Sequence, residues 1–209
     1  MGLHGVKDGQ IEEKEQDIVT IEVIPINTQI VKFSFDRHKQ MKEIVMTEIN
    51  KVKQDYLEND MDKDNARISY TDWGSGTDEN RNWYNIFKKD LHTQFLKAAN
   101  FLGFRNFIAR EVWFQSYKKN DLHTWHIHSC NYTGVYYLNY DKNCKTELYD
   151  PIIKKKFFID AKEGDMVFFP SFIIHRSPRK NNIKNKTIIS WNIDFELVTT
   201  DMLKEVNEH

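Results

Sequence analysis

Residues 117–139 read YKKNDLHTWHIHSCNYTGVYYLN, and the fold and the chemistry both depend on this stretch. His126 and His128 are separated by one residue, and alternate residues of a β-strand point to the same face, so their imidazoles can lie side by side. A third histidine, His175, follows a second apolar run at 164–170, GDMVFFP. Two ring nitrogens from one strand and one from a distant strand supply the ligands of an open catalytic metal site. The pattern predicts a β-barrel that holds one metal ion.

The composition is that of a single folded domain. The chain has 209 residues, of which 40% are hydrophobic and 13% aromatic, enough for a buried core. No apolar run approaches the ~20 residues of a membrane span, and a net charge of −1 gives no basic face for nucleic acid. Residues 1–16 lack the apolar core of a signal peptide, and Cys130 and Cys144 form no disulfide framework. We therefore expect a cytoplasmic protein with no membrane or nucleic-acid partner, of unknown oligomeric state.

The first hundred residues predict a tail, a pair of strands and two helices. Residues 1–17 are polar and are expected to form a loose tail. Alternating stretches at 19–25 and 29–35 predict two strands separated by a turn. Asp36 can cap a helix, and helical spacing of apolar residues continues to about residue 60.

A second helix is expected at 80–101, with Gly103 ending it. The apolar stripes of the two helices are expected to be Met41, Ile44, Val45, Ile49 and Val52, and then Trp83, Ile86, Phe87, Leu91, Phe95 and Leu96. The charged stretch 59–65 between them lacks the Gly and the closing Glu of an EF-hand, so we do not expect it to bind calcium.

The second half of the chain is a succession of short strands. They are expected at 107–118, 135–139, 147–149, 157–161, 165–169 and 186–197. This distribution indicates an α+β protein with a jelly-roll or cupin-like barrel, N-terminal strands, and two helices covering one outer face. We expect one domain over 1–209, in which 18–103 support a barrel formed by 104–197.

The second half also resembles a known family, the 2-oxoglutarate- and Fe(II)-dependent oxygenases, in their prolyl-hydroxylase-like branch. The resemblance covers about half the chain and rests on ordered motifs, which here read HIH, GVYYLN, GDMVFFP, the distal His175, and Lys186 at the start of KTIISWNIDF. Having H-x-H where the family has H-x-carboxylate makes the sequence similar to phage and marine bacterial types. The resemblance implies a double-stranded β-helix, Fe(II), 2-oxoglutarate as cosubstrate, O2, and an unidentified small-molecule or peptide substrate that is oxidised, most simply by hydroxylation.

A cation is needed for the far carboxylate of 2-oxoglutarate, because an unpaired carboxylate in an apolar barrel is very costly. Lys186 stands at the family's cation position, with Arg179 and Lys184 as competitors. On its strand Lys186, Ile188, Ser190 and Asn192 are expected to line the barrel, while Thr187, Ile189, Trp191 and Ile193 pack outward. The resemblance places the Tyr137 hydroxyl on the same carboxylate, and Tyr117 can add a second hydroxyl. Trp113 and Gln115 share the face of Tyr117 and are candidates, with Asn192, for the substrate pocket.

The metal ligands depart from the family pattern, since His128 stands where Asp or Glu is usual. His128 can be a true ligand of a three-histidine site, or a carboxylate such as Asp150 or Glu147 can replace it, or the site can be degenerate. We favour the first interpretation. His123 does not share a strand face with His126 and is interpreted as a loop residue.

Two other kinds of protein fit parts of the pattern. A cupin-like metalloenzyme that uses no oxoacid would also carry HIH and a distal histidine, although Thr133 stands near the position of the cupin Glu. A β-barrel binding module without catalysis is the other. Lys186 distinguishes these proteins from an oxygenase, because only the oxygenase needs a buried cation.

Overall fold

The computed structural model describes residues 28–52, 66–140, 142–179, 181 and 186–198. The expected tail at 1–17, the expected strand at 19–25, the charged stretch 59–65 and Lys184 lie outside these residues. In the described part of the chain, no helix is both long and apolar enough to span a membrane.

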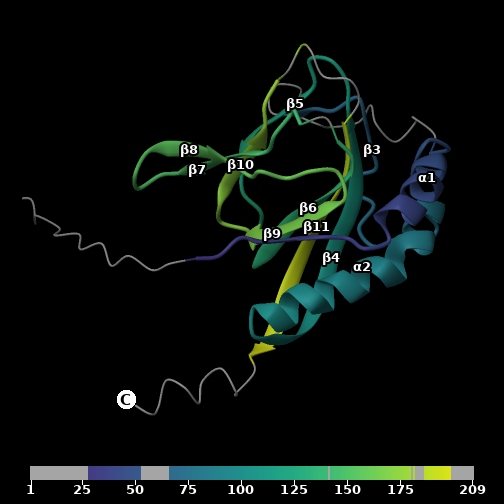
Figure 1. Ribbon diagram of the computed structural model, residues 1–209, viewed down its shortest axis with the longest axis horizontal. Helices are drawn as coiled ribbons and strands as arrows, with labels where there is room; N and C mark the ends of the chain where they lie inside the picture. The colour runs from purple at the N-terminus through teal and green to yellow at the C-terminus, as the bar shows by residue number, and fades with distance from the viewer. Residues whose placement is uncertain (1–27, 53–65, 141, 180, 182–185, 199–209) are drawn as a thin grey trace, which may run out of the picture.

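Two antiparallel sheets face each other and form the barrel (Figure 1). The larger sheet has six strands in the order β1-β9-β6-β11-β4-β3. Its members are β1 (Val31–Ser34), β3 (Tyr70–Thr71), β4 (Phe104–Tyr117), β6 (Tyr132–Asn139), β9 (Asp165–Pro170) and β11 (Lys186–Val198). The smaller sheet has five strands in the order β2-β5-β10-β7-β8. These are β2 (Ala66–Arg67), β5 (Leu122–His126), β7 (Glu147–Asp150), β8 (Lys155–Phe158) and β10 (Ile174–Ser177). The expected jelly-roll architecture is confirmed.

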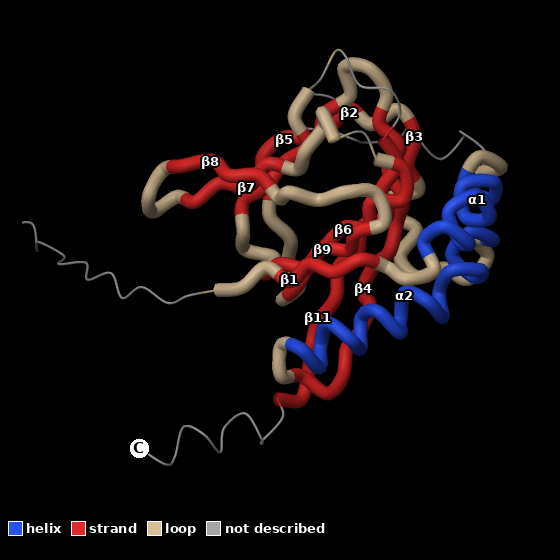
Figure 2. Tube along the Cα trace, in the orientation of Figure 1, coloured by secondary structure: helices blue, strands red, loops and turns tan. Residues whose placement is uncertain are grey.

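Two helices, α1 (His38–Ile49) and α2 (Asn82–Phe101), lie on one side of the larger sheet (Figure 2). Strand β11 faces them with Ile189, Trp191 and Ile193, which are buried in one apolar cluster with the helical residues Phe87, Leu91 and Phe95. Three of the four residues expected to pack outward on β11 do so, whereas Thr187 lies outside this cluster and its hydroxyl bonds Ser116 Oγ at 2.8 Å. Ile44, Ile86 and Leu96, which were expected in the helical stripes, are exposed, because Val45, Tyr84 and Ala98–Ala99 occupy the contact with the sheet instead.

Helix α1 is shorter than the sequence predicts. Its apolar spacing continues toward residue 60, but the helix ends at Ile49, where the Tyr70 hydroxyl donates to the Ile49 carbonyl at 2.6 Å and to the Val52 carbonyl. Carbonyls at a helix end have no intrahelical partner, so a donor from a distant residue stabilises the end there. The N-cap is Arg37 rather than Asp36, and no side-chain hydrogen bond caps the helix.

A buried carboxylate fixes the start of α2 against strand β4. Asp72 accepts hydrogen bonds from Arg81, from the Trp83 indole and from the Phe114 backbone N–H, each at 2.8 Å. A buried charge is tolerated only when it is paired and fully hydrogen-bonded, and Asp72 meets this condition. The contacts hold β4 in place, and its other face looks into the barrel.

Gly134 on β6 is paired with Trp191 on β11, and there is no room for a side chain at this glycine. A Cβ there would lie 2.7 Å from Trp191 Nε1 and would also collide with the Val167 backbone carbonyl on β9. Neither partner can move freely, because Trp191 is buried in the core and Val167 is paired with Val135 in the sheet. The glycine of the GVYYLN motif is thus required by packing.

We expect Gly134→Ala to lower the free energy of unfolding by about 3 kcal/mol or more, because the added methyl group must displace backbone of the larger sheet. Equilibrium denaturation of the purified protein measures this. The matched control is Gly74→Ala, where φ is +88° and no atom lies within 4 Å, so only the backbone conformation is penalised, by about 1–2 kcal/mol. Equal losses in the two variants would contradict the role given to crowding.

Candidate metal centre

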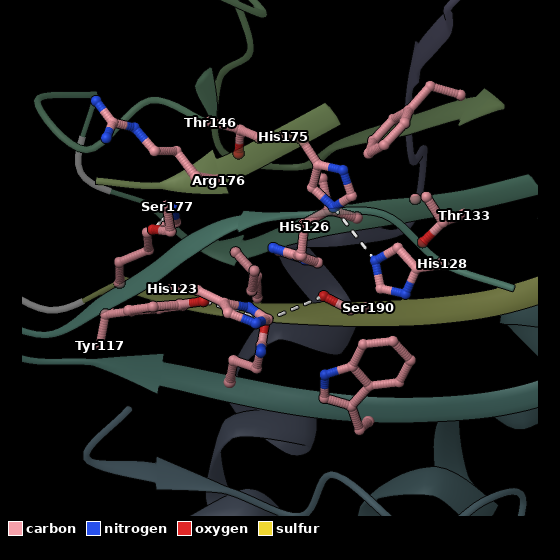
Figure 3. Close-up of a pocket in the computed structure, with 17 residues that line it drawn as sticks. Tyr117, His123, His126, His128, Thr133, Thr146, His175, Arg176, Ser177 and Ser190 are labelled. Atoms are coloured by element: carbon pink, nitrogen blue, oxygen red, sulfur yellow. Dashed lines mark hydrogen bonds between the residues drawn. The ribbon is translucent and has the colours of Figure 1, made fainter. Parts of the chain in front are cut away.

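Three histidines converge between the two sheets (Figure 3). His126 ends strand β5, His175 lies on β10, and the two are direct partners across the antiparallel ladder. His128 follows two residues later, where its backbone N–H donates to the Ser171 carbonyl at 3.0 Å. The nearest ring nitrogens of the three side chains all lie within 4.8 Å of one another. Strand pairing and one loop hydrogen bond therefore bring together segments that are almost 50 residues apart, His128 and His175 being separated by 47.

The ring orientations of two of these histidines are fixed by backbone carbonyls. Nδ1 of His126 donates to the Thr124 carbonyl at 2.7 Å, and Nδ1 of His175 donates to the Ile173 carbonyl at 2.8 Å. With the proton on Nδ1, Nε2 of each neutral ring keeps a free lone pair. A carbonyl that accepts from one ring nitrogen and so orients the other is the usual support of a metal-binding histidine.

Burial keeps the imidazoles neutral. It lowers the pKa of His126, lowers the pKa of His128 to about 4, and lowers the pKa of His175 well below its ordinary value. The neighbouring rings lower the last two pKa values further, since a second imidazolium would be repelled by the first. Metal ligation requires the unprotonated ring, so the three side chains are in the form that binds an ion at neutral pH.

The geometry of this cluster fits a single divalent ion. Nε2 of His128 and Nε2 of His175 are 3.2 Å apart. Two nitrogens that each lie about 2.1 Å from one ion are separated by about 3 Å when they subtend an angle near 100°. Three protein ligands leave further coordination positions open, which suits a catalytic rather than a structural metal.

Neither carboxylate considered as a replacement for His128 joins this cluster. Glu147 is bound by Arg176 at 2.6 Å, and Asp150 accepts from the backbone of Ile152 and Ile153 in the β7–β8 turn. Among the described residues, the only group with metal-site geometry is the three histidines. The choice of His128 as the third ligand stays a prediction, now with a geometry that accommodates it.

Three local expectations about this stretch are wrong. His128 is not on the strand with His126, because β5 ends at His126 and the chain turns toward Ser171. Alternation along one strand would turn Ile127 away from the two histidines and into the core, but it is 57% exposed for the same reason. His123 is a residue of β5 rather than of a loop, and its ring stacks on that of His126 with centroids 3.7 Å apart. Burial beside the other imidazoles lowers the pKa of His123 to about 3.

A cavity extends from the histidines to Lys186. Lys186 is fully buried, and its ammonium contacts Ser177 Oγ at 3.2 Å, Cys144 Sγ at 3.9 Å and the ring face of Tyr117 at 5.0 Å. No carboxylate pairs with it among the described residues. Burial lowers the pKa of Lys186. A buried ammonium without a counter-ion is costly, so this end of the cavity is prepared for an anion.

The tyrosines expected near this cation occupy different positions. Tyr117 lines the cavity, and its hydroxyl donates to Gln115 Oε1 at 3.2 Å. Tyr137 is fully buried beside the cavity wall, where its hydroxyl bonds Thr146 Oγ1 at 2.9 Å, and Thr146 itself lines the cavity. Burial raises the pKa of both tyrosines, so both remain protonated donors.

Trp113 and Gln115 line the cavity, as their strand face predicts, but Asn192 does not. A register shift in β11 follows Asn192, and its amide donates to Glu111 at 3.2 Å near the outer rim. Of the competing cations, Arg179 is exposed. Arg176 also lines the cavity, yet it is held by Glu147 and by the Trp125 ring, 4.3 Å from its guanidinium carbon.

Sequence reasoning missed Ser177, Thr146 and His123, which all line the cavity. Ser177 could have been found, because it lies two residues after His175 and so shares its strand face. Thr146 and His123 carried no such signal, since their positions depend on how β7 and β5 enter the smaller sheet.

The fold is shared with solved structures of low sequence identity. A prolyl hydroxylase from Trichoplax adhaerens, in complex with a hypoxia inducible factor peptide, superimposes with a TM-score of 0.60 at 14% identity, over 86% of this chain and 87% of that chain. A prolyl-4-hydroxylase from Pseudomonas putida gives 0.56 at 13% identity, over 81% and 94%. A viral collagen prolyl hydroxylase from Paramecium Bursaria Chlorella virus-1, with 2OG bound, gives 0.54 at 14% identity, over 78% and 94%. No family model and no curated protein matches the sequence. The structural likeness confirms the double-stranded β-helix fold.

Two substitutions at His128 test the ligand set. His128→Ala should weaken binding of Fe(II), or of Co(II) as a stable substitute, by at least about 100-fold, since loss of a supporting partner alone costs about 10- to 100-fold. His128→Asp should bind at least as tightly as the wild type, because a carboxylate adds the negative charge that three imidazoles lack. Anaerobic calorimetric titration measures both affinities. His92→Ala, a helical histidine outside the cluster, is the control, and wild-type affinity in His128→Ala would exclude His128 as a ligand.

Proposed function

We propose that this protein is an Fe(II)- and 2-oxoglutarate-dependent oxygenase, most simply a hydroxylase. The observation that carries the proposal is the Lys186 ammonium, which is fully buried with no anionic partner among the described residues, in the same cavity as the three histidines. A three-histidine site for one metal ion would, by itself, fit many enzymes. A three-histidine site and a buried ammonium in one cavity fit a ligand that has an anionic group at each end.

Hydroxyl groups around Lys186 support a carboxylate in particular. Ser177 Oγ already contacts the ammonium, and the Tyr117 and Thr146 hydroxyls line the same cavity. A carboxylate has about four acceptor sites, and one ammonium cannot satisfy them all. The surrounding hydroxyls can donate to the others, so a dicarboxylate such as 2-oxoglutarate would be fully hydrogen-bonded at this end.

The roles of the side chains follow from their positions. His126, His128 and His175 would hold the iron, and Lys186 would hold the far carboxylate, so the cosubstrate is fixed at both of its ends. Iron with the bound oxoacid supplies activation of O2 and oxidative decarboxylation to succinate, the part of the chemistry that belongs to the cofactor. The buried apolar residues Val135, Phe169 and Ile188 also line the cavity, so part of its wall is apolar.

The structural neighbours support the same proposal and suggest the kind of substrate. One of them was solved with 2OG bound, and another with a peptide fragment. We propose that the oxidised partner here is a peptide or a small molecule and that O2 is the co-reactant. A cytoplasmic location agrees with the two cysteines, Cys130 and Cys144, which are both free.

The other two kinds of protein account for less of the site. A cupin-like enzyme without an oxoacid gives Lys186 no anion to bind, and Thr133, near the cupin Glu position, donates to the Trp191 carbonyl at 2.8 Å. A binding module without catalysis does not explain why backbone carbonyls hold the Nδ1 atoms of His126 and His175 within one cluster of three histidines.

Lys186→Met is the most direct substitution for testing the cosubstrate. Wild-type protein with Fe(II) and O2 should convert 2-oxoglutarate to succinate, and the variant should lose oxoacid binding by about 100-fold or more, since the pair is charged and desolvated. Succinate formation and calorimetric titration of the oxoacid give the two measurements. Lys156→Met, on the exposed strand β8, is the control. Unchanged binding in Lys186→Met would refute the assignment.

The same substitution should stabilise the protein when no ligand is bound. We expect Lys186→Met to raise the free energy of unfolding by about 1–4 kcal/mol at pH 7, because a buried charge is replaced by an apolar group of similar length. The pKa of Lys186 is lowered below 10.5 in the folded state, so the unfolded state binds more protons between the two pKa values. Wild-type stability should therefore rise relative to the variant as the pH approaches 10.5. Denaturation curves measured from pH 7 to 10 test this, and a destabilised variant would contradict it.

A further inference from the structure

Trp113, Gln115 and Tyr117 lie on one face of strand β4 and line the cavity. We call these three hydrogen-bond donors the donor wall. Trp113 lines the cavity and is 3% exposed, and its indole Nε1 is buried with no acceptor in the described part of the chain. A buried donor without a partner costs about 1–3 kcal/mol, and such groups are rare in folded proteins. An acceptor supplied by a ligand would remove this cost.

Gln115, two residues farther along β4, offers a second donor. Its Oε1 accepts from the Tyr117 hydroxyl at 3.2 Å and from the Ser190 hydroxyl at 3.3 Å. The Ser190 hydroxyl, which is not needed by the far carboxylate, is enough to fix the orientation of the amide, and this leaves the NH₂ group of Gln115 for another partner. None of the described residues accepts from it, although Gln115 also lines the cavity.

The strand register places these donors in order along the cavity. Tyr117 pairs with Lys186, Gln115 with Ile188, and Trp113 with Ser190. Tyr117 and Trp113 are four residues apart, about 13 Å along the strand. The Trp113 ring lies 6.1 Å from the His128 ring, centre to centre. The wall thus begins at the buried ammonium and ends beside the histidines.

We propose that Trp113 Nε1–H and the Gln115 amide N–H donate to the carboxylate at the keto-acid end of the cosubstrate, next to the metal. This inference rests on the proposed function. Three neutral imidazoles bring no negative charge to the metal, so the oxoacid supplies the anion there. The carboxylate oxygens that the metal leaves free need donors, because the side chains around them are largely buried. Trp113 and Gln115 are therefore positioning residues that hold the keto-acid carboxylate beside the metal.

The proton on the Trp113 indole gives a direct readout. In Zn(II)-loaded, ¹⁵N-labelled full-length protein, addition of 2-oxoglutarate should move the Trp113 indole N–H resonance downfield, as expected for a proton that gains an acceptor. Succinate has a carboxylate for Lys186 but no keto-acid end, and it should leave this resonance in place. An indole resonance that stays put while 2-oxoglutarate binds overturns the inference, and the donors then serve the oxidised substrate instead.

Substitution supplies a second, independent measurement. Trp113→Phe keeps an aromatic ring but removes the donor, and it should raise the Kd for 2-oxoglutarate by about 10- to 100-fold, as for a hydrogen bond to a charged group. Its Kd for succinate should not change. Trp125→Phe is the control, since Trp125 is 36% exposed and does not line the cavity.

The outcomes separate this inference from the function on which it rests. If 2-oxoglutarate does not bind wild-type protein, both fail. If Lys186→Met loses the oxoacid while Trp113→Phe binds it with wild-type affinity, only the donor wall is refuted. Loss of affinity in both variants, with a shifted indole resonance in the wild type, supports both.

Discussion

An ammonium group buried without a counter-ion is the constraint on which this structure depends. Lys186 begins strand β11 between Tyr117 of β4 and Ser177 of β10, so both sheets contribute to the enclosure of its charge. Neither hydroxyl neutralises the charge, and the free protein carries a cost of several kcal/mol. Such a cost is tolerated where a ligand removes it, and under the proposed function that ligand is an oxoacid chelated by a metal that the three histidines would hold.

In β4 and β11, alternate residues point to opposite faces of the sheet, so one set packs in the hydrophobic core and the other lines the cavity. Ile189, Trp191 and Ile193 of β11 pack against the helices, whereas Lys186, Ile188 and Ser190 of the same strand line the cavity. Strand β4 divides in the same way, with Phe114 and Val112 in the core and Trp113 and Gln115 toward the cavity. A shift of the β4–β11 register by one residue would exchange the two sets, so the hydrophobic core also fixes the position of the donors.

Much of this arrangement follows from the sequence, and the remainder has physical causes that a sequence does not display. The alternation in β11 predicts which of its faces carries Lys186, and the continuous apolar runs of β6 and β9 match strands that are buried on both faces. The stop of α1 at Ile49 depends instead on the hydroxyl of Tyr70, a tertiary contact. Strand β5 is short and polar, and its end at His126 is set by pairing with β10, so neither the loop position of His128 nor the strand position of His123 could be read from spacing. Thr146 supports Tyr137 through a contact between β6 and the segment before β7, which no local pattern encodes.

The central claim is that one oxoacid bridges the three histidines and Lys186. Its most direct test is the visible absorption spectrum of the Fe(II)-loaded protein, recorded without O2 while 2-oxoglutarate is added. A charge-transfer band that saturates at one equivalent of oxoacid, and that succinate does not produce, is the result expected from a keto acid chelating the iron. Protein that retains its iron through the titration and shows no such band would contradict the account.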